Sequence, residues 1–249
     1  MLARKKYSEA RQVFSRIAKI NKKPMFHEKI IGEITGSELS SSPPLARKST
    51  CCDLFKQSKR EVVLLFVVPI LWLAGDITSY GIQYGLNHLS GSLYTNGKLL
   101  GVADFCACFS VGLISNCWGR KPAIMIMWFL AALGCISYHF LKDYSTWGYV
   151  CVTVGRFGSN AAFAMMFLIT TETFPTAFRG TMYAISNACA RVGGIVAPLI
   201  PSFMPSFMLF EGIVAAVSLA LSFALIETKG RAMKDEVNTR VPMSKSEDD

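Results

Sequence analysis

The chain has 249 residues, of which 51% are hydrophobic, and its formal net charge at pH 7 is +9. A soluble domain of this length could bury a complete core, but the apolar residues here are gathered into long runs that are typical of membrane helices. The basic residues form no face of a soluble fold, so nucleic acid is not the expected partner.

The first part of the chain, residues 1–60, is basic and polar and is predicted to be cytoplasmic. Residues 1–20 have the spacing of an amphipathic helix, which Pro24 ends. Residues 35–50 form a linker that contains serine and proline. This composition contains no apolar core of a signal peptide, so a cleaved leader is not expected.

Six apolar runs follow, and each is long enough to cross about 30 Å of hydrocarbon as a helix. They predict an all-α membrane protein with a six-helix transmembrane domain over residues 61–226 and a cytoplasmic tail over residues 227–249. The predicted spans are 62–86, 98–117, 122–141, 147–171, 180–203 and 206–226.

The distribution of basic residues predicts the orientation. Fourteen of the 26 Lys and Arg lie in residues 1–60 and five lie after residue 226, whereas the opposite loops hold only Lys98 and Lys142. An excess of Lys and Arg marks the cytoplasmic side of short loops. Both termini are therefore expected in the cytoplasm, in a multi-pass protein surrounded by membrane lipid.

Residues that could support metal or bond chemistry are scattered. The eight cysteines lie mostly in spans, where cysteine behaves as a small hydrophobe, and no CxxC pair occurs. His27, His88 and His139 lie on different segments, and no nucleophile motif is present. We therefore expect no metal, no cofactor and no enzymatic activity.

Four short passages have a recognisable order along the chain. They are Tyr7-Ser8-Glu9-Ala10 with Ile17-Ala18-Lys19-Ile20-Asn21, Gly119-Arg120-Lys121-Pro122, Glu172-Thr173-Phe174-Pro175-Thr176 with Arg179, and Glu227-Thr228-Lys229-Gly230. At these places in a six-span pattern they resemble the organic cation/anion transporter family of the major facilitator superfamily. The resemblance covers about residues 1–233 and corresponds to the central loop and the second half of that family.

The resemblance implies a twelve-helix fold of two six-helix halves around a central cavity, with the substrate between the halves. Six helices alone would expose a polar cavity wall to lipid, which is costly. We therefore expect a fragment or truncated product that lacks a first six-helix half, or one partner of a two-chain assembly.

The implied activity is transport of small organic ions by alternating access, with the plasma membrane as the expected location. The alternative is a six-span partner that does not transport and modulates a full-length transporter.

Ionisable residues inside the spans are candidates for function. Asp76, Asp104, Arg156 and Arg191 lie at membrane depth, while Glu211 lies in the outer third of the last span, where it is expected to reach water. The alternative to substrate contact is mutual neutralisation, for example of Arg191 by Asp76 or Asp104, because a charge at the centre of a bilayer needs a partner or a wet cavity.

Helical spacing adds polar neighbours on the same stripes as these charges. Arginine can hold a carboxylate with paired donors, and aromatic faces receive flat rings or cations. The candidate substrate-binding residues are Asp76, Tyr80, Gln83, Asp104, Arg156, Asn187 and Arg191.

The resemblance also bears on the charge of the substrate. A basic residue just before the Gly-Gly pair of the fifth span, here Arg191, is typical of anion or carnitine-type members, whereas cation transporters often have an acidic residue. The lysine that anion transporters tend to carry in the preceding hairpin is replaced by Cys108. An organic anion or zwitterion is therefore slightly favoured over a cation, and mixed specificity stays open.

The cytoplasmic turns hold four charged residues that the resemblance places at a gate. Arg120, Lys121, Glu172 and Arg179 cluster at one membrane face, where a charge network could latch helices in the outward-open state. The alternative is that Arg120 and Lys121 only set the topology.

Overall fold

The computed structural model describes residue 16 and residues 59–88, 92–141 and 145–230, and these ranges contain helices and no strand. Arg16 is helical and exposed. The rest of the predicted helix over residues 1–20, the linker over 35–50 and the tail beyond residue 230 lie outside the described residues. All the helices from α4 onward belong to one compact unit, residues 50–249.

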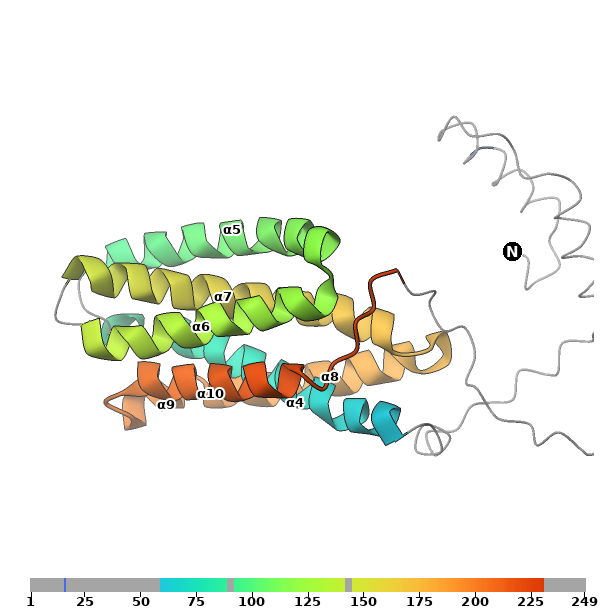
Figure 1. The fold of residues 1–249 in the computed structure, drawn as a ribbon. Coiled ribbons are helices and arrows are strands. Elements are labelled where there is room, and N and C mark those ends of the chain that lie inside the picture. The colour runs from blue at the N-terminus through green and yellow to red at the C-terminus, as the bar shows by residue number, and fades with distance from the viewer. Residues whose placement is uncertain (1–15, 17–58, 89–91, 142–144, 231–249) are drawn as a thin grey trace, which may run out of the picture. The chain divides into compact units, whose positions relative to one another are not determined.

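The helices form an elongated bundle in which they run along one another (Figure 1). In chain order they are α4 (Lys59–Tyr84), the 3-10 turn η2 (Gly85–His88), α5 (Leu93–Trp118), α6 (Arg120–Leu141), α7 (Ser145–Thr173), α8 (Thr176–Val196), α9 (Leu199–Phe203) and α10 (Phe207–Ser222). The first four predicted spans are confirmed as α4 to α7. The all-α fold class is confirmed as well.

The fifth and sixth spans differ in detail from the prediction. The fifth is two helices, because Pro198 has no backbone N–H to continue α8, and α9 begins directly after it at Leu199. The sixth helix, α10, has 16 residues and a length of about 24 Å, which is less than the usual hydrocarbon thickness. Within the described residues, five helical segments are long and apolar enough to cross a membrane, and α10 is a shorter apolar helix.

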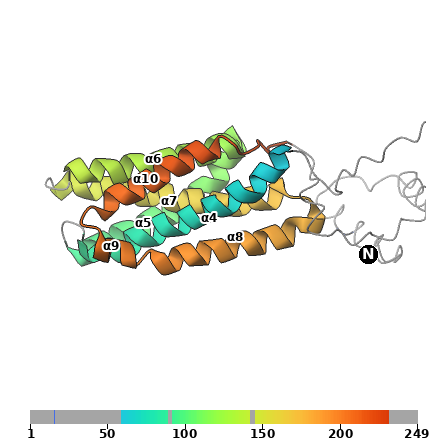
Figure 2. The same ribbon diagram turned by 90° about the horizontal axis from the view of Figure 1, so that it is seen from below.

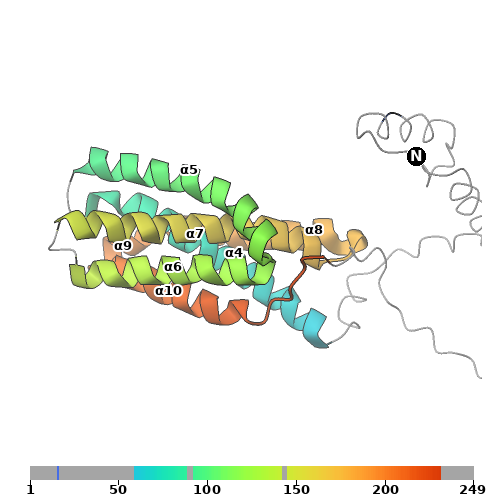
Figure 3. The same cartoon turned by 45° about the horizontal axis from the view of Figure 1, so that its top comes forward.

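Helix α4 occupies a position shared by several neighbours. It packs against α7, against α8 and against α10, and α8 and α10 lie on opposite sides of it (Figure 2). Helix α7 contacts α4, α5 and α6, and α5 lies along its far side from α10 (Figure 3). The helix that a side chain of α4 contacts therefore depends on the face of α4 from which that side chain projects.

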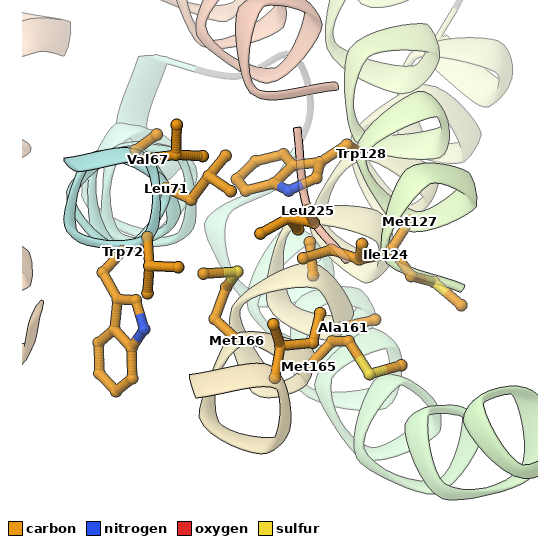
Figure 4. Close-up of a cluster of buried hydrophobic side chains, with 14 of the residues drawn as sticks. Val67, Leu71, Trp72, Ile124, Met127, Trp128, Ala161, Met165, Met166 and Leu225 are labelled. Atoms are coloured by element: carbon orange, nitrogen blue, oxygen red, sulfur yellow. The ribbon is translucent and has the colours of Figure 1, made fainter. Parts of the chain in front are cut away.

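The apolar core lies between α4, α6 and α7 (Figure 4). Trp128 of α6 extends toward Leu71 of α4, and both are fully buried. Leu225, which follows α10, is also fully buried in this cluster. The segment after α10 is thus fixed to the core, and this anchoring holds the next residues, including Glu227, at the turn between α5 and α6.

Candidate functional site

An arginine and a carboxylate form a paired ion bridge at membrane depth. Arg156 of α7 donates to both oxygens of Asp104 on α5, from Nε to Oδ1 at 2.7 Å and from Nη2 to Oδ2 at 2.8 Å. The Arg156 side chain is only 7% exposed, whereas Asp104 is 33% exposed. Such a two-point pair fixes orientation as well as charge, so it links α5 to α7.

Three further groups complete the hydrogen bonding around this pair. Arg156 also donates to the backbone carbonyl of Ser79 and, at 3.3 Å, to the Gln83 side-chain oxygen, both on α4. Asn160 of α7 donates to Asp104 Oδ1 at 3.0 Å. The buried guanidinium of α7 thus has hydrogen-bond partners on both α5 and α4. A buried charge is tolerated only when it is paired and hydrogen-bonded in this way.

A second pair joins α4 to α8 and is much looser. Arg191 Nη1 lies 3.8 Å from Asp76 Oδ2, and the Arg191 side chain is 61% exposed while Asp76 is fully buried. Neither Asp76 oxygen accepts a hydrogen bond from the described residues. Gly193 permits the close approach of α8 to α4, because a Cβ there would lie 2.6 Å from the Leu73 carbonyl oxygen, and the next residue, Gly194, faces Asp76 Oδ2.

The remaining predicted substrate residues lie beside these two pairs. Tyr80 of α4 borders Gly194 and stacks with the exposed Tyr84, with ring centroids 6.1 Å apart. Asn187 is one helical turn before Arg191 on α8, and its Oδ1 is buried with no hydrogen-bond partner among the described residues. The predicted set therefore falls into two groups, one at Arg156 and one at Arg191, and α4 contributes to both.

An aromatic cluster between α4, α7 and α8 was not predicted as a unit. The fully buried Trp72 ring packs against Phe163, Phe167 and Tyr183, and its Nε1 donates to Thr170 Oγ1 at 2.8 Å. The one signal in the sequence was the pair of phenylalanines four residues apart on α7. Apolar helices contain many such pairs, so the spacing alone could not single it out.

The charges that were predicted to be cytoplasmic form a second, separate network at the ends of α5, α6 and α7. Arg120 donates from Nη2 to Glu172 Oε1 at 2.9 Å and from Nε to Glu172 Oε2 at 3.0 Å. Thr228 donates to the same Glu172 carboxylate. Lys121 Nζ donates to the carbonyl of Phe223 at 2.7 Å.

Glu227 joins the segment after α10 to the start of α6 in this network, a role that the sequence alone did not assign to it. Its oxygens accept the backbone N–H groups of Arg120 at 2.9 Å and Lys121 at 3.0 Å. Partial burial alone would raise the pKa of the Glu227 carboxyl, but backbone donors at Lys229, Arg120 and Lys121 together hold it below its ordinary value.

Gly119 makes the close approach of Glu227 possible. Its φ is 101°, which disfavours a side chain, and a Cβ there would lie 2.7 Å from Glu227 Oε2. The fourth predicted gating residue, Arg179, is on the first turn of α8, where its backbone N–H donates to the Pro175 carbonyl at 2.9 Å.

The expectation that Glu211 reaches water is wrong. Its side chain is fully buried, because α10 presents this residue to α4 at Gly81 and does not turn it outward. Within the described ranges, no group of three or more His, Cys, Asp or Glu side chains is placed to hold a metal ion.

Charged side chains paired between long apolar helices define a multi-pass helical membrane protein. The sequence profile described as Major Facilitator Superfamily matches residues 33–241, so the chain belongs to that superfamily.

The curated relatives are solute carriers. The chain is 31% identical to solute carrier family 22 member 16 of Bos taurus over 92% of its own length and 41% of the relative's. It is 29% identical to solute carrier family 22 member 6 of Rattus norvegicus, over 91% of this chain and 42% of that protein. It is 24% identical to the organic cation transporter protein of Drosophila melanogaster, over 95% and 45%. The chain thus spans about two fifths of the length of the curated relatives it matches.

Proposed function

We propose that the chain is the second six-helix half of an organic-ion transporter, which works by alternating access together with six further helices. The similarity to solute carriers over more than nine tenths of the chain, but only two fifths of those proteins, supports this division. Halves of this superfamily enclose the substrate between them, so an unpaired half presents one wall of the cavity.

The observation that carries the proposal is the imbalance within the Arg191–Asp76 pair. Asp76 is fully buried while Arg191 is 61% exposed, and the two atoms that approach most closely are 3.8 Å apart. Much of the guanidinium is therefore accessible to a second carboxylate, and arginine binds carboxylates with paired donors. An organic anion, or the carboxylate of a zwitterion, is the substrate class that this arrangement favours.

The two arginines have different proposed roles. Arg156 is 7% exposed and already holds both oxygens of Asp104, so we assign it to fixing α4, α5 and α7 relative to one another. We assign Arg191 to binding the charged group of the substrate, with Tyr80 and Asn187 beside it. Gln83 lies at the Arg156–Asp104 pair. Asp104 is one third exposed, which leaves it open to polar groups of the substrate.

The cytoplasmic network is proposed as the gate. Arg120, Lys121 and Glu172 connect the ends of α5, α6 and α7 to the segment after α10, and Arg179 lies at the start of α8 on the same side. The carboxylates of this network would be released when the helices rock apart. The excess of Lys and Arg in both terminal segments supports a cytoplasmic location for both termini.

Two dyes of similar shape and opposite charge test the substrate class. The full chain is reconstituted in vesicles, alone and with the first six helices of solute carrier family 22 member 16, and uptake of fluorescein and rhodamine 123 is measured. We expect fluorescein uptake to exceed rhodamine uptake and to fall at least tenfold in Arg191→Ala. Lys98→Ala, an exposed position on α5, is the matched control.

Three outcomes would contradict parts of this proposal. Fluorescein uptake that survives Arg191→Ala removes Arg191 from the site. Preferred rhodamine uptake overturns the anion preference. Co-purification with a complete transporter, with no uptake by either vesicle, supports the alternative of a partner that modulates transport without performing it.

A further inference from the structure

Glu211 is a buried carboxyl that the proposed transport site does not use. It lies on the first half of α10 and is fully buried, and neither of its oxygens has a hydrogen-bond partner among the described residues. It faces Gly81 of α4 so closely that a Cβ at that position would overlap Glu211 Oε1. The carboxyl thus occupies space that only glycine on α4 can leave open.

The titratable groups around Glu211 offer no opposing charge within the described residues. From α6, the Cys135 thiol lies beside it, and Tyr138 belongs to the same buried cluster. On α4, Asp76 and Tyr80 border Gly194 of α8 instead. On η2, the His88 ring contacts Phe207, which lies one turn before Glu211 on α10.

The burial of the Glu211 carboxyl without a counter-charge determines its protonation state. Transfer of an ionised carboxylate from water to a buried position without a partner is strongly unfavourable, whereas transfer of a neutral carboxylic acid costs far less. Membrane spans rarely contain such a group unless it has a function. In this arrangement Glu211 therefore holds a proton, and it can release that proton only when water reaches the contact between α4 and α10.

Helix α4 connects this carboxyl to the proposed substrate site. Gly81 and Asp76 are five residues apart, so their positions around the axis of α4 differ by about 140°. Asp76 meets α8 and Gly81 meets α10, and these two helices lie on opposite sides of α4 (Figure 2). A shift of α4 that opens the contact with Glu211 must also change the geometry at Asp76.

We propose that Glu211 is a proton-binding site whose occupancy is linked, through the position of α4, to the Asp76–Arg191 pair. The ligand is a proton taken from water by the carboxylate and returned to water when α4 and α10 part. The link to organic-ion binding rests on the proposed function of Arg191, whereas the proton site itself does not.

Infrared spectroscopy of the full chain in lipid nanodiscs tests the site without any transport assay. Isotope-labelled glutamate separates glutamic acid carbonyl bands from those of aspartic acid. We expect a protonated glutamic acid band at neutral pH that is lost in Glu211→Gln and disappears reversibly in the wild type at alkaline pH. The same band in Glu211→Gln, or none in the wild type, overturns the proton site.

A second variant covers the case in which Glu211→Gln does not fold. Gly81→Ala keeps the carboxyl but displaces it from α4, because the added Cβ overlaps Oε1. The pH at which the band disappears then differs from that of the wild type. Gly97→Ala, where nothing lies within 4 Å of the added Cβ, is the matched control and leaves that pH unchanged. An unchanged pH in Gly81→Ala contradicts the assignment to Glu211.

The linkage to the substrate pair has its own measurement. Coupled sites affect each other reciprocally, typically fivefold or more in affinity. We expect Arg191→Ala to change the proton dissociation constant of the Glu211 band at least about fivefold, and Lys98→Ala to leave it unchanged. No change in Arg191→Ala overturns the linkage. A shift without any dye uptake retains the linkage and removes only the proposed transport of those ions.

Discussion

At the scale of single residues, the strongest constraint is that a buried guanidinium keeps its counter-charge. Arg156 is 7% exposed and binds Asp104 at two points. Removing one partner of a buried pair leaves an uncompensated charge, which costs more than the intact pair contributes. We therefore expect Asp104→Asn to destabilise the chain by about 3 kcal/mol, the lower end of that range, because Asp104 is partly exposed.

Thermal unfolding in detergent checks this expectation, with a double-mutant cycle as its control. Asp104→Asn combined with Arg156→Gln removes both charges, so its cost is expected to be clearly smaller than the sum of the two single costs. Additive costs would show that the two side chains do not act as a pair.

The sequence placed all four charges at membrane depth but could not choose their partners. Arg191 was expected to meet Asp76 or Asp104, and the structure pairs it with Asp76 while Arg156 takes Asp104. Depth along a span follows from counting residues. The choice of partner depends on which helices are neighbours and how each is rotated, and neither property is encoded in the spacing of one span. Glu211 was misjudged for the same reason.

The carboxyl of Glu227 makes the network around Arg120 and Glu172 sensitive to acid. Its pKa is held below the ordinary value of 4.5 in the folded chain, so its contribution to stability is complete above about pH 5 and is lost as the pH falls through the lowered value. We expect Glu227→Gln to be less stable than the wild type at pH 7, and the difference to vanish in strong acid. Unfolding temperatures across pH measure it; a difference that persists unchanged would contradict the role of the charge.

At the scale of elements, α6 and α7 approach each other so closely that their backbones are in contact. A Cβ at Gly134 of α6 would overlap the backbone of Gly155 on α7, and a Cβ at Gly158 of α7 would lie 2.7 Å from the Met127 carbonyl oxygen. Small residues that let backbones approach are a common basis of helix association in membranes. These two glycines therefore set the separation of α6 and α7.

Two identical substitutions separate packing from helix propensity. Gly134→Ala introduces the overlap, whereas Gly112→Ala on α5 meets nothing within 4 Å. Both gain the same helix propensity, so we expect Gly134→Ala to be less stable than Gly112→Ala by about 1–3 kcal/mol, the usual cost of overpacking. Equal unfolding temperatures would show that α6 and α7 can separate without loss.

The elements themselves were predictable where a long apolar run decided them. Helices α4 to α7 follow the predicted spans because burial of about 20 apolar residues leaves a continuous helix as the only way to satisfy the backbone in lipid. The break at Pro198 and the early end of α10 at Ser222 were missed. The break follows from the missing backbone N–H of Pro198. The end of α10 depends on where the chain is anchored afterwards, and Leu225 and Glu227 supply that anchor through contacts with distant helices.

At the scale of the whole molecule, the orientation in the membrane is a prediction from the distribution of Lys and Arg, and helix α5 offers a direct test. Tyr94 is 81% exposed near the start of α5, and Cys117 is exposed near its end, beside the cytoplasmic network. The two positions are 23 residues apart, which corresponds to a rise of about 35 Å along a helix, enough to cross the hydrocarbon. The two positions are therefore expected on opposite faces of the bilayer.

Labelling of single cysteines with a membrane-impermeant maleimide measures this. One variant keeps only Cys117, and a second carries only Tyr94→Cys. In intact cells we expect labelling of Tyr94→Cys alone, and of Cys117 only after the membrane is permeabilised, because the excess of Lys and Arg in the terminal segments predicts that the Cys117 end faces the cytoplasm. Labelling in the reverse order would invert the topology and move the Arg120 network to the outside. Labelling of both in intact cells would mean that α5 does not span the bilayer, and the six-span architecture would then fail with it.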